Sequence, residues 1–369
     1  MQNQFSFGLE AEFLLADEEK KRFLWIDDID FFEIYALLES LPLDGIPPLD
    51  GLDMEKAHPK LMPYVVEGYH RKINDSVTMQ VKGLEIRTPV CQSIKECLDV
   101  YEKLYQRLEE KIITSGRKLV SVSHHPYSFH FWGPQEERRA DFWKWAIEVM
   151  TTYGPDINIR FPQSTSNAIF SNLDDFNAKL NYYAPALTAF TLSSPFCKGD
   201  FLINAKEQKC QSIRTFKRSP YAPTFESHME EGERIEFKFF EMTPSLYDFN
   251  VYFDLCLVLG LSENLKGRAL DQTRIYELGN ICFEGVQLPG IKEKMKEVLL
   301  EGIRLLPKYG FESIRLERLL EDIEYFQNPS EKLFGMDFQK EQIWRYLETR
   351  SKMRSKPYIF STQKNETDA

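Results

Sequence analysis

The sequence lacks the features of a membrane, secreted or nucleic-acid-binding protein. Its longest apolar run, around Leu255–Leu261, is too short to span a bilayer. The N-terminus has neither the basic nor the apolar segment of a signal peptide. The net charge of −11 argues against nucleic acid or an anionic membrane as the main partner. We therefore expect no nucleic acid and no membrane among its partners.

Cysteines are few and show no pairing pattern. The chain has six, none in a Cys-x-x-Cys motif and none at zinc-finger spacing from a histidine. Most lie in apolar stretches, which is typical of reduced, buried thiols in a cytosolic protein. We therefore predict a cytoplasmic location.

Several common nucleotide-binding and catalytic motifs are also absent. The sequence contains no P-loop and no Gly-x-Gly-x-x-Gly segment, so a Walker or Rossmann site is not expected. No Ser–His–Asp or Cys–His arrangement can be assembled from local sequence. What the 369 residues do offer is enough hydrophobic side chains, 43%, for a sizeable core, and a 14% aromatic share that favours strands.

Hydrophobic periodicity predicts strands and helices over the first two-thirds of the chain and helices from about residue 249. We expect strands at 5–15, 63–71, 77–87, 118–123, 156–161 and 234–242, helices at 29–41, 93–116, 137–151 and 173–194, and an irregular segment at 197–232. This order indicates an α+β fold with a mainly antiparallel sheet and helices packed on one side. We expect one domain at 1–355 and a disordered tail at 356–369.

The first strand places two carboxylates on one face. Side chains alternate along a strand, so Glu10 and Glu12 point one way, and Leu9, Ala11 and Phe13 point the other. Carboxylates stacked in this manner repel each other unless water solvates them or a divalent cation lies between them. The alternatives are a metal site and an ordinary amphipathic strand with a wet face.

Two later strands repeat this pattern with one acid and one base. Glu85 and Arg87 share a face, as do Glu236 and Lys238, and either pair could be an ordinary ion pair on a polar strand face. If the three strands belong to one sheet, their four glutamates line one concave surface and the two cations add positive charge. Magnesium and ATP phosphates need hard carboxylate oxygens and cations in this combination.

A basic segment at 212–220 carries Arg214 and Arg218. Arginine suits a bidentate grip on carboxylate or phosphate groups. A solvated surface loop is the alternative interpretation.

The order of these motifs resembles the glutamate–cysteine ligase family of the carboxylate–amine ligase type, whose members have a curved, glutamine synthetase-like sheet with helices on its outer face. The resemblance runs from about Phe7 to the helices past Arg268 and depends on the order of the motifs. These motifs are Glu10-Ala11-Glu12, Leu84-Glu85-Ile86-Arg87-Thr88-Pro89-Val90, His125-Pro126, Ser194-Pro195-Phe196, Arg214-Thr215-Phe216-Lys217-Arg218-Ser219-Pro220 and Ile235-Glu236-Phe237-Lys238.

The resemblance implies roles for particular residues. Magnesium is expected at four glutamates and one amide: Glu10, Glu12, Glu85, Glu236 and Asn158. The nucleotide is expected at Arg214, Arg218, Lys238 and Arg160. The catalytic cations are expected to be Arg87, Lys238 and Arg214, which neutralise developing charge.

The chain departs from the family pattern at two places. Asn158-Ile159-Arg160 stands where family members carry His-x-His or Gln-x-Asn, and Lys238 replaces an arginine. The resemblance implies an ATP- and Mg²⁺-dependent ligase that joins a carboxylate, expected to be glutamate, to an amine through an acyl phosphate. Its partners would be amino-acid substrates, and a homo-oligomer stays open. The alternative is a catalytically degenerate member that binds a nucleotide or a partner protein.

Overall fold

The computed structural model describes residues 4–54, 58–73, 76–127, 151–218, 223–230, 232–269 and 275–361 of the chain. The helix predicted at 137–151 lies outside these residues, apart from its last position.

Within the described residues, eight strands form one antiparallel sheet in the order β3-β4-β1-β6-β10-β9, with β2 and β5 paired to the far half of β1. The strands are β1 Ser6–Asp17, β2 Arg22–Phe23, β3 Tyr64–Ile73, β4 Ser76–Arg87, β5 Arg117–Val120, β6 Pro155–Arg160, β9 Phe225–His228 and β10 Arg234–Phe237. A separate small hairpin joins β7 Phe196–Cys197 to β8 Asp200–Phe201. The long first strand is therefore the centre of the sheet.

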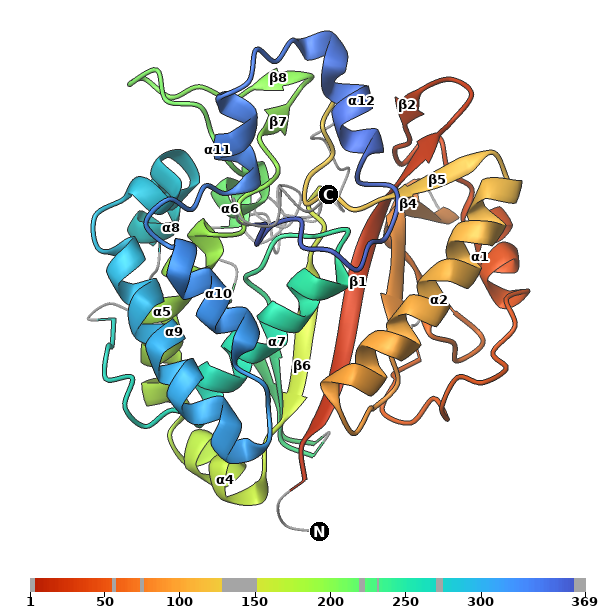
Figure 1. Ribbon diagram of the computed structural model, residues 1–369. Helices are drawn as coiled ribbons and strands as arrows, with labels where there is room; N and C mark the ends of the chain where they lie inside the picture. Colours follow the sequence, from red (N-terminus) through yellow and green to blue (C-terminus); the bar gives the residue numbers. More distant parts are fainter. Residues whose placement is uncertain are drawn as a thin grey trace.

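Helices cover one face of this sheet (Figure 1). Helix α2 packs on β1 and β4, α7 packs on β6, and α9 packs in turn on α5, α7 and α10. The helices are α1 Phe31–Glu39, α2 Ile94–Thr114, α4 Gln163–Ser171, α5 Leu173–Ala189, α6 Ile213–Arg218, α7 Leu246–Leu261, α8 Ile275–Glu284, α9 Ile291–Leu305, α10 Ile314–Asp322, α11 Pro329–Phe334 and α12 Ile343–Glu348. Short 3-10 turns lie at Gly285–Gln287, Leu306–Tyr309 and Lys340–Gln342.

The alternation of β1 explains why the helices lie where they do. Its apolar residues Leu9, Ala11 and Phe13 are fully buried. The ring of Phe13 packs 5.6 Å from that of Tyr105 in α2. Since side chains alternate across a strand, the residues between them must point to the opposite, concave face. The apolar face thus anchors the helical layer and leaves the polar face for the site.

The predicted α+β fold is confirmed, including the curled antiparallel sheet with helices on its outer face. The predicted strand at 234–242 is too long, because β10 ends at Phe237. Its continuation buries Phe239 and Phe240 in succession, which a strand with one polar face cannot do. The segment 197–232 is not irregular throughout either, since it contains β7, β8, α6 and β9.

The C-terminal segment differs from the predicted tail as far as Ser361. The backbone amides of Tyr358, Ile359 and Phe360 donate to the carboxylate of Asp248 at the start of α7. Ile359 and Phe360 are buried. These contacts fasten the segment to the helical layer, whereas residues 362–369 lie outside the described part of the chain.

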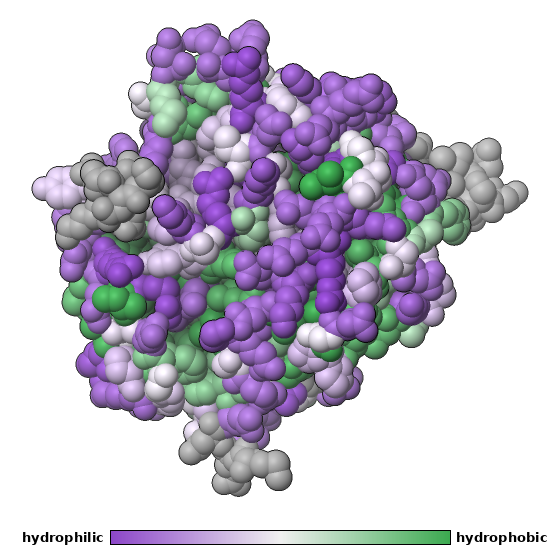
Figure 2. Space-filling view, turned by 45° about the vertical axis from the view of Figure 1, so that its right-hand side comes forward, coloured by the Kyte–Doolittle hydropathy of each residue, from purple (hydrophilic) through white to green (hydrophobic). Residues whose placement is uncertain are grey.

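Across the described residues, no helix is long and apolar enough to cross a membrane. Hydrophilic side chains cover most of the face drawn in Figure 2, and apolar ones form small groups between them.

Candidate active site

The sheet brings the acidic residues predicted from sequence onto one surface. Glu12 pairs with Glu85 between β1 and β4, and Glu236 pairs with Asn158 between β10 and β6. Residues paired across an antiparallel ladder share a face. Glu10 lies two residues from Glu12 on β1 and therefore points to the same side. The predicted placement of the four glutamates on one face of one sheet is confirmed.

These acids divide into two groups, and the first is a cluster of three carboxylates from three adjacent strands. Oxygens of Glu10, Asp156 and Glu236 all lie within 4.8 Å of one another. We call this set the three-strand cluster. Asp156 is absent from the residues proposed from sequence. It lies two residues before Asn158 on β6, so strand alternation, counted back from Asn158, could have found it.

The three-strand cluster brings three carboxyl groups close together in a buried place. Burial, together with the charge of Glu236, raises the pKa of Glu10 to about 7. Burial also raises the pKa of Asp156 to about 6. A divalent cation would relieve this repulsion, and carboxylate oxygens are the ligands that magnesium prefers. The residues present therefore fit a magnesium ion.

Three cationic side chains contact the three-strand cluster. The ammonium of Lys238 lies 3.1 Å from Asp156 and also contacts Glu236. Arg234 lies 3.2 Å and His228 2.7 Å from Glu236. Although burial alone would raise the pKa of Glu236, these neighbours hold it well below its usual range. Glu236 is thus the ionised member of the cluster.

The second group surrounds a buried lysine, and we call it the Lys82 cluster. The ammonium of Lys82 lies 2.6 Å from Glu12 and 3.6 Å from Glu67, and it donates to the backbone oxygen of Thr152 at 3.0 Å. Glu85 joins the group as the cross-strand partner of Glu12, and it also contacts Arg87 at 2.7 Å. The Lys82 side chain is only 4% exposed. A full positive charge therefore sits inside this cluster.

The Lys82 cluster has mixed proton affinities. Burial raises the pKa of Glu67 to about 7 and that of Glu85 well above its usual range. For Glu12 burial acts in the same direction, but the charge and hydrogen bond of Lys82 outweigh it and lower the pKa. Glu67 and Lys82 are both absent from the residues proposed from sequence.

A β-bulge explains how Lys82 reaches the polar face. Strict alternation would place it beside Leu84 and Ile86 on the apolar face. Between β3 and β4, Glu67 pairs with Gly83 but the next pair joins Gly68 to Val81, so Lys82 is the extra residue. Glycines within strands often mark bulges, and Gly68 and Gly83 were the available sequence signal.

Arg214 lies close to acids of both clusters, Glu12 and Asp156. Its side chain is buried, and Nη2 donates to the backbone oxygen of Lys238 at 3.0 Å. The guanidinium packs directly on Gly154, where a Cβ atom would collide with it. The backbone N–H of Gly154 in turn donates to Glu12 at 2.8 Å. Burial and the charge of Arg218 lower the pKa of Arg214 to about 10.

Helix α6, which carries Arg214 and Arg218, is fixed by a buried carboxylate. Glu241 accepts hydrogen bonds from the hydroxyls of Ser194, Ser212 and Thr215 at 2.6–3.1 Å. This network joins the Ser-Pro-Phe segment, the start of α6 and the chain after β10. It therefore determines where the arginine side chains of α6 begin.

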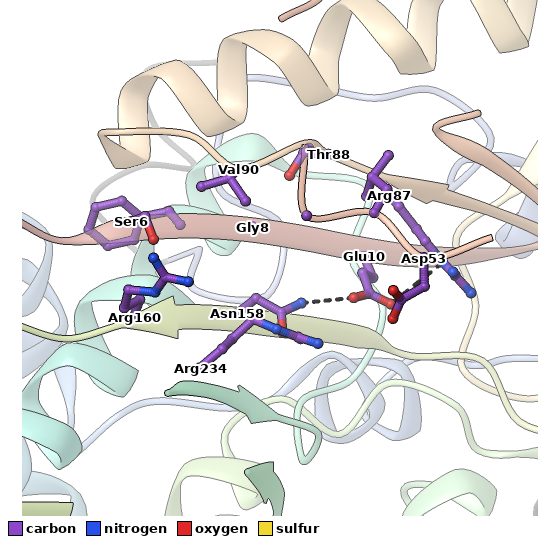
Figure 3. Close-up of a pocket in the computed structure, with 13 residues that line it drawn as sticks. Ser6, Gly8, Glu10, Asp53, Arg87, Thr88, Val90, Asn158, Arg160 and Arg234 are labelled. Carbon is purple, nitrogen blue, oxygen red and sulfur yellow. Dashed lines mark hydrogen bonds and ion pairs between the residues drawn. The ribbon is translucent and has the colours of Figure 1, made fainter. Parts of the chain in front are cut away.

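A cavity of about 230 Å³ lies next to the three-strand cluster. Figure 3 shows Arg160 at one end, beside Ser6, and Glu10 and Asp53 at the other. Asn158 lies between the ends, where its Nδ2 donates to Glu10 at 3.0 Å and its Oδ1 accepts from Arg234. The remaining lining residues are Phe7, Gly8, Gly51, Leu52, Arg87, Thr88 and Val90.

The structure thus divides the residues proposed from sequence into separate groups. Glu10, Glu236 and Lys238 meet at the three-strand cluster, whereas Glu12 and Glu85 belong to the Lys82 cluster. The amide of Asn158 is engaged by protein groups, Arg214 is buried, and Arg160 lines the cavity. The role of each residue stays a prediction.

Comparison with known proteins identifies one matching family. The family model for glutamate-cysteine ligase family 2 matches residues 6–230. A search of curated proteins finds no match. The match ends before β10, so Glu236 and Lys238 lie beyond it.

Three solved structures share the fold. A bifunctional glutathione synthetase from Pasteurella multocida is 14% identical with a TM-score of 0.57, covering 95% of this chain and 50% of that one. The present chain therefore spans half the length of that protein. A glutamate–cysteine ligase from Francisella tularensis, solved with AMP, is 12% identical with a TM-score of 0.54 over 95% and 88% of the two chains. The ligase PafA, solved with the ubiquitin-like protein Pup, is 10% identical with a TM-score of 0.50 over 100% and 72%.

Proposed function

This chain belongs to glutamate-cysteine ligase family 2, and on that premise we propose that it is an ATP-dependent ligase that joins a carboxylate to an amine. The donor we expect is glutamate or a close relative. One of its carboxylate oxygens attacks the γ-phosphorus of ATP, ADP leaves, and an acyl phosphate forms. The amine nitrogen then attacks the acyl carbon and expels phosphate, which leaves an amide.

The observation that carries this proposal is the three-strand cluster. Glu10, Asp156 and Glu236 supply oxygens close enough to hold one cation, next to a cavity that can take a small substrate. When bound, magnesium would offset the negative charge of the ATP phosphates. In the proposal Glu12 and Glu85 serve a second metal position, which must compete with Lys82 and Arg87 for their oxygens.

The cations of the site have different places in the proposal. Lys238 and Arg87 border the acidic surface, where they can neutralise charge on the transferred phosphoryl group. Burial raises the pKa of Asp156, and the charge of Arg218 partly opposes this rise. We therefore propose that Arg218 is close enough to the cluster to contact a phosphate. Arg214 is buried, so we propose that it positions the Lys238 and Glu12 segments. This catalysis consists mainly of positioning and electrostatics.

The test is ADP release that requires both a carboxylate and an amine. Glu10→Gln should lower turnover by about 10²–10³-fold, the range found when one strong electrostatic group of a site is removed. Glu110→Gln is the matched control, since Glu110 is exposed on α2, on the other side of the sheet. Full turnover in Glu10→Gln would contradict the assignment of Glu10 as a magnesium ligand.

The same assay separates the degenerate alternative and identifies the acceptor. Calorimetry that detects Mg·ATP binding, without turnover for any carboxylate and amine pair, would favour a catalytically inactive member. A screen of amino acids and small amines for ADP release would define the acceptor. The free state of all six cysteines supports a cytoplasmic location, which we retain as part of the proposal.

A further inference from the structure

The cavity beside the three-strand cluster is smaller than a typical pocket for a drug-sized ligand. Its volume of about 230 Å³ lies below the roughly 300–1,000 Å³ typical of pockets for drug-sized ligands. A nucleoside triphosphate is larger than such a space. An amino acid is a better match in size, which raises the question of what its lining would recognise.

One end of the cavity is cationic because of the strand register. Arg160 of β6 pairs directly with Arg234 of β10. The guanidinium of Arg234 lies beside Asn158, so Arg160 supplies the positive charge at this end of the cavity (Figure 3). Arg234 contacts Glu236 and Asn158, and Arg160 is an exposed residue that lines the cavity and packs on the backbone of Gly232. A guanidinium in this position suits bidentate binding of a carboxylate.

The other end of the cavity carries the carboxylates of Glu10 and Asp53 together with Arg87, which lies 3.7 Å from Glu10, and it adjoins the proposed reaction centre. Glu10 enters it from β1, and Asp53 enters it from the loop that follows α1 (Figure 3). Arg160 pairs with Ser6, and Glu10 lies four residues further along β1, a separation of about 13 Å. The long arginine side chain shortens this gap. A ligand the length of a dicarboxylic amino acid can therefore contact both ends.

Gly8 keeps the floor between these ends open. It lies between Ser6 and Glu10 on the polar face of β1, and a Cβ atom there would come within 3.3 Å of the Cβ of Asn158. Without a side chain, the strand leaves room for a ligand to lie across it.

We propose that this cavity binds the donor amino acid, with Arg160 on its α-carboxylate and Asp53 on its α-ammonium group. The second carboxylate of the ligand then points to Glu10, Asp156 and Glu236, where it would be activated. This inference depends on the proposed function and deepens it. It moves Arg160 from the nucleotide, where the sequence resemblance placed it, to the substrate, as a residue that determines specificity.

The experiment uses ligand analogues that each lack one group. 4-Aminobutanoate retains the reacting carboxylate of glutamate but lacks the α-carboxylate, and glutarate lacks the ammonium group. Wild-type protein should favour glutamate over 4-aminobutanoate by about 10–100-fold in kcat/KM, the range for one charge-assisted hydrogen bond. Arg160→Met should lower the value for glutamate to that for 4-aminobutanoate and leave the latter and the KM for ATP unchanged.

Three further variants sharpen the assignment. Arg160→Lys should retain part of the preference, because it keeps the charge but loses the bidentate fork. Asp53→Asn should reduce the preference for glutamate over glutarate and leave the comparison with 4-aminobutanoate intact. Arg22→Met is the matched control, since Arg22 lies on β2 at the opposite end of β1 and its side chain is exposed.

The outcomes distinguish this inference from the proposed function. If turnover occurs and Arg160→Met affects glutamate and 4-aminobutanoate equally, or raises the KM for ATP instead, the inference is overturned and the function stands. If no turnover occurs, calorimetry with glutamate, Mg²⁺ and a non-hydrolysable ATP analogue still tests whether the cavity binds glutamate. Weaker glutamate binding in Arg160→Met supports the cavity assignment although the function fails, and no glutamate binding by wild-type protein overturns it.

Discussion

The two acidic clusters on the polar face contain the same kinds of residue, yet they are electrostatically different. In the Lys82 cluster the cation sits among the carboxylates, almost fully buried and held by a backbone carbonyl. In the three-strand cluster Lys238 is 15% exposed, and it contacts Asp156 and Glu236. Lys82 thus lies between Glu12 and Glu67 of the first cluster, whereas in the second burial, together with the charge of Glu236, raises the pKa of Glu10 to about 7. We therefore expect a metal ion to stabilise the three-strand cluster more than the Lys82 cluster.

Replacement of Lys82 should have the largest effect on the free energy of unfolding. Lys82→Met leaves Glu12 and Glu67 buried without their common partner, and one-sided removal of a buried ion pair costs about 3–5 kcal/mol in the free energy of unfolding. Without Lys82, burial raises the folded-state pKa values of both carboxyls. The deficit should therefore be greatest above pH 7 and shrink as pH falls toward 4.5, and urea denaturation at several pH values would measure it.

Two matched variants test whether burial is the cause. Lys238→Met should cost less, because Arg234 and His228 still contact Glu236. Lys95→Met should cost about 0–1 kcal/mol, since Lys95 is 83% exposed in a surface pair. Equal costs for Lys82→Met and Lys95→Met would contradict the distinction between the clusters.

A change at Gly154 should disturb both clusters at once, with a smaller effect on stability. Gly154→Ala places a Cβ atom in the position of the Arg214 guanidinium, and overpacking of this kind costs about 1–3 kcal/mol. Displacement of Arg214 should also lower turnover, by up to about 10²-fold if the site shifts by 1 Å. Thermal unfolding and ADP release measure the two effects.

The control for this variant is another glycine. Gly279→Ala in α8 meets no atom within 4 Å and should be neutral or stabilising by about 0.5–1 kcal/mol. If both variants behave alike, the close packing of Arg214 on Gly154 has no consequence for the site.

The pH dependence of magnesium binding should show the smallest effect. In the absence of metal, the folded-state pKa values of Glu10 and Asp156, about 7 and about 6, exceed the values of 4.5 and 3.8 for unperturbed carboxyls. The stability from their protonated forms is therefore complete below pH 4 and is lost as pH rises to 7. Magnesium competes with these protons, so it should stabilise the protein more at pH 8 than at pH 5.5.

The expected size of this effect is modest. Magnesium at ten times its dissociation constant contributes about 1.4 kcal/mol, which thermal unfolding with and without the ion can detect. Glu10→Gln should remove the gain, and Glu85→Gln should preserve most of it. The reverse result would assign the tighter site to the Lys82 cluster.

Much of the fold could be predicted from local patterns, and parts of the site could not. Alternation along β1 correctly placed Glu10 and Glu12 on one face. It did not reveal Lys82, because the bulge reverses the direction of that side chain. Asp156 becomes a candidate metal ligand only because the sheet places it beside Glu10 and Glu236, which come from other strands.

By itself, the sequence determined which face of its strand each acidic residue occupies, because the two-residue period of a strand depends on local geometry alone. Only the tertiary structure decided which carboxylates meet and which of them receive a cation. Strand register is fixed by packing between segments far apart in the chain, and a one-residue bulge is enough to move a lysine from the core to the site.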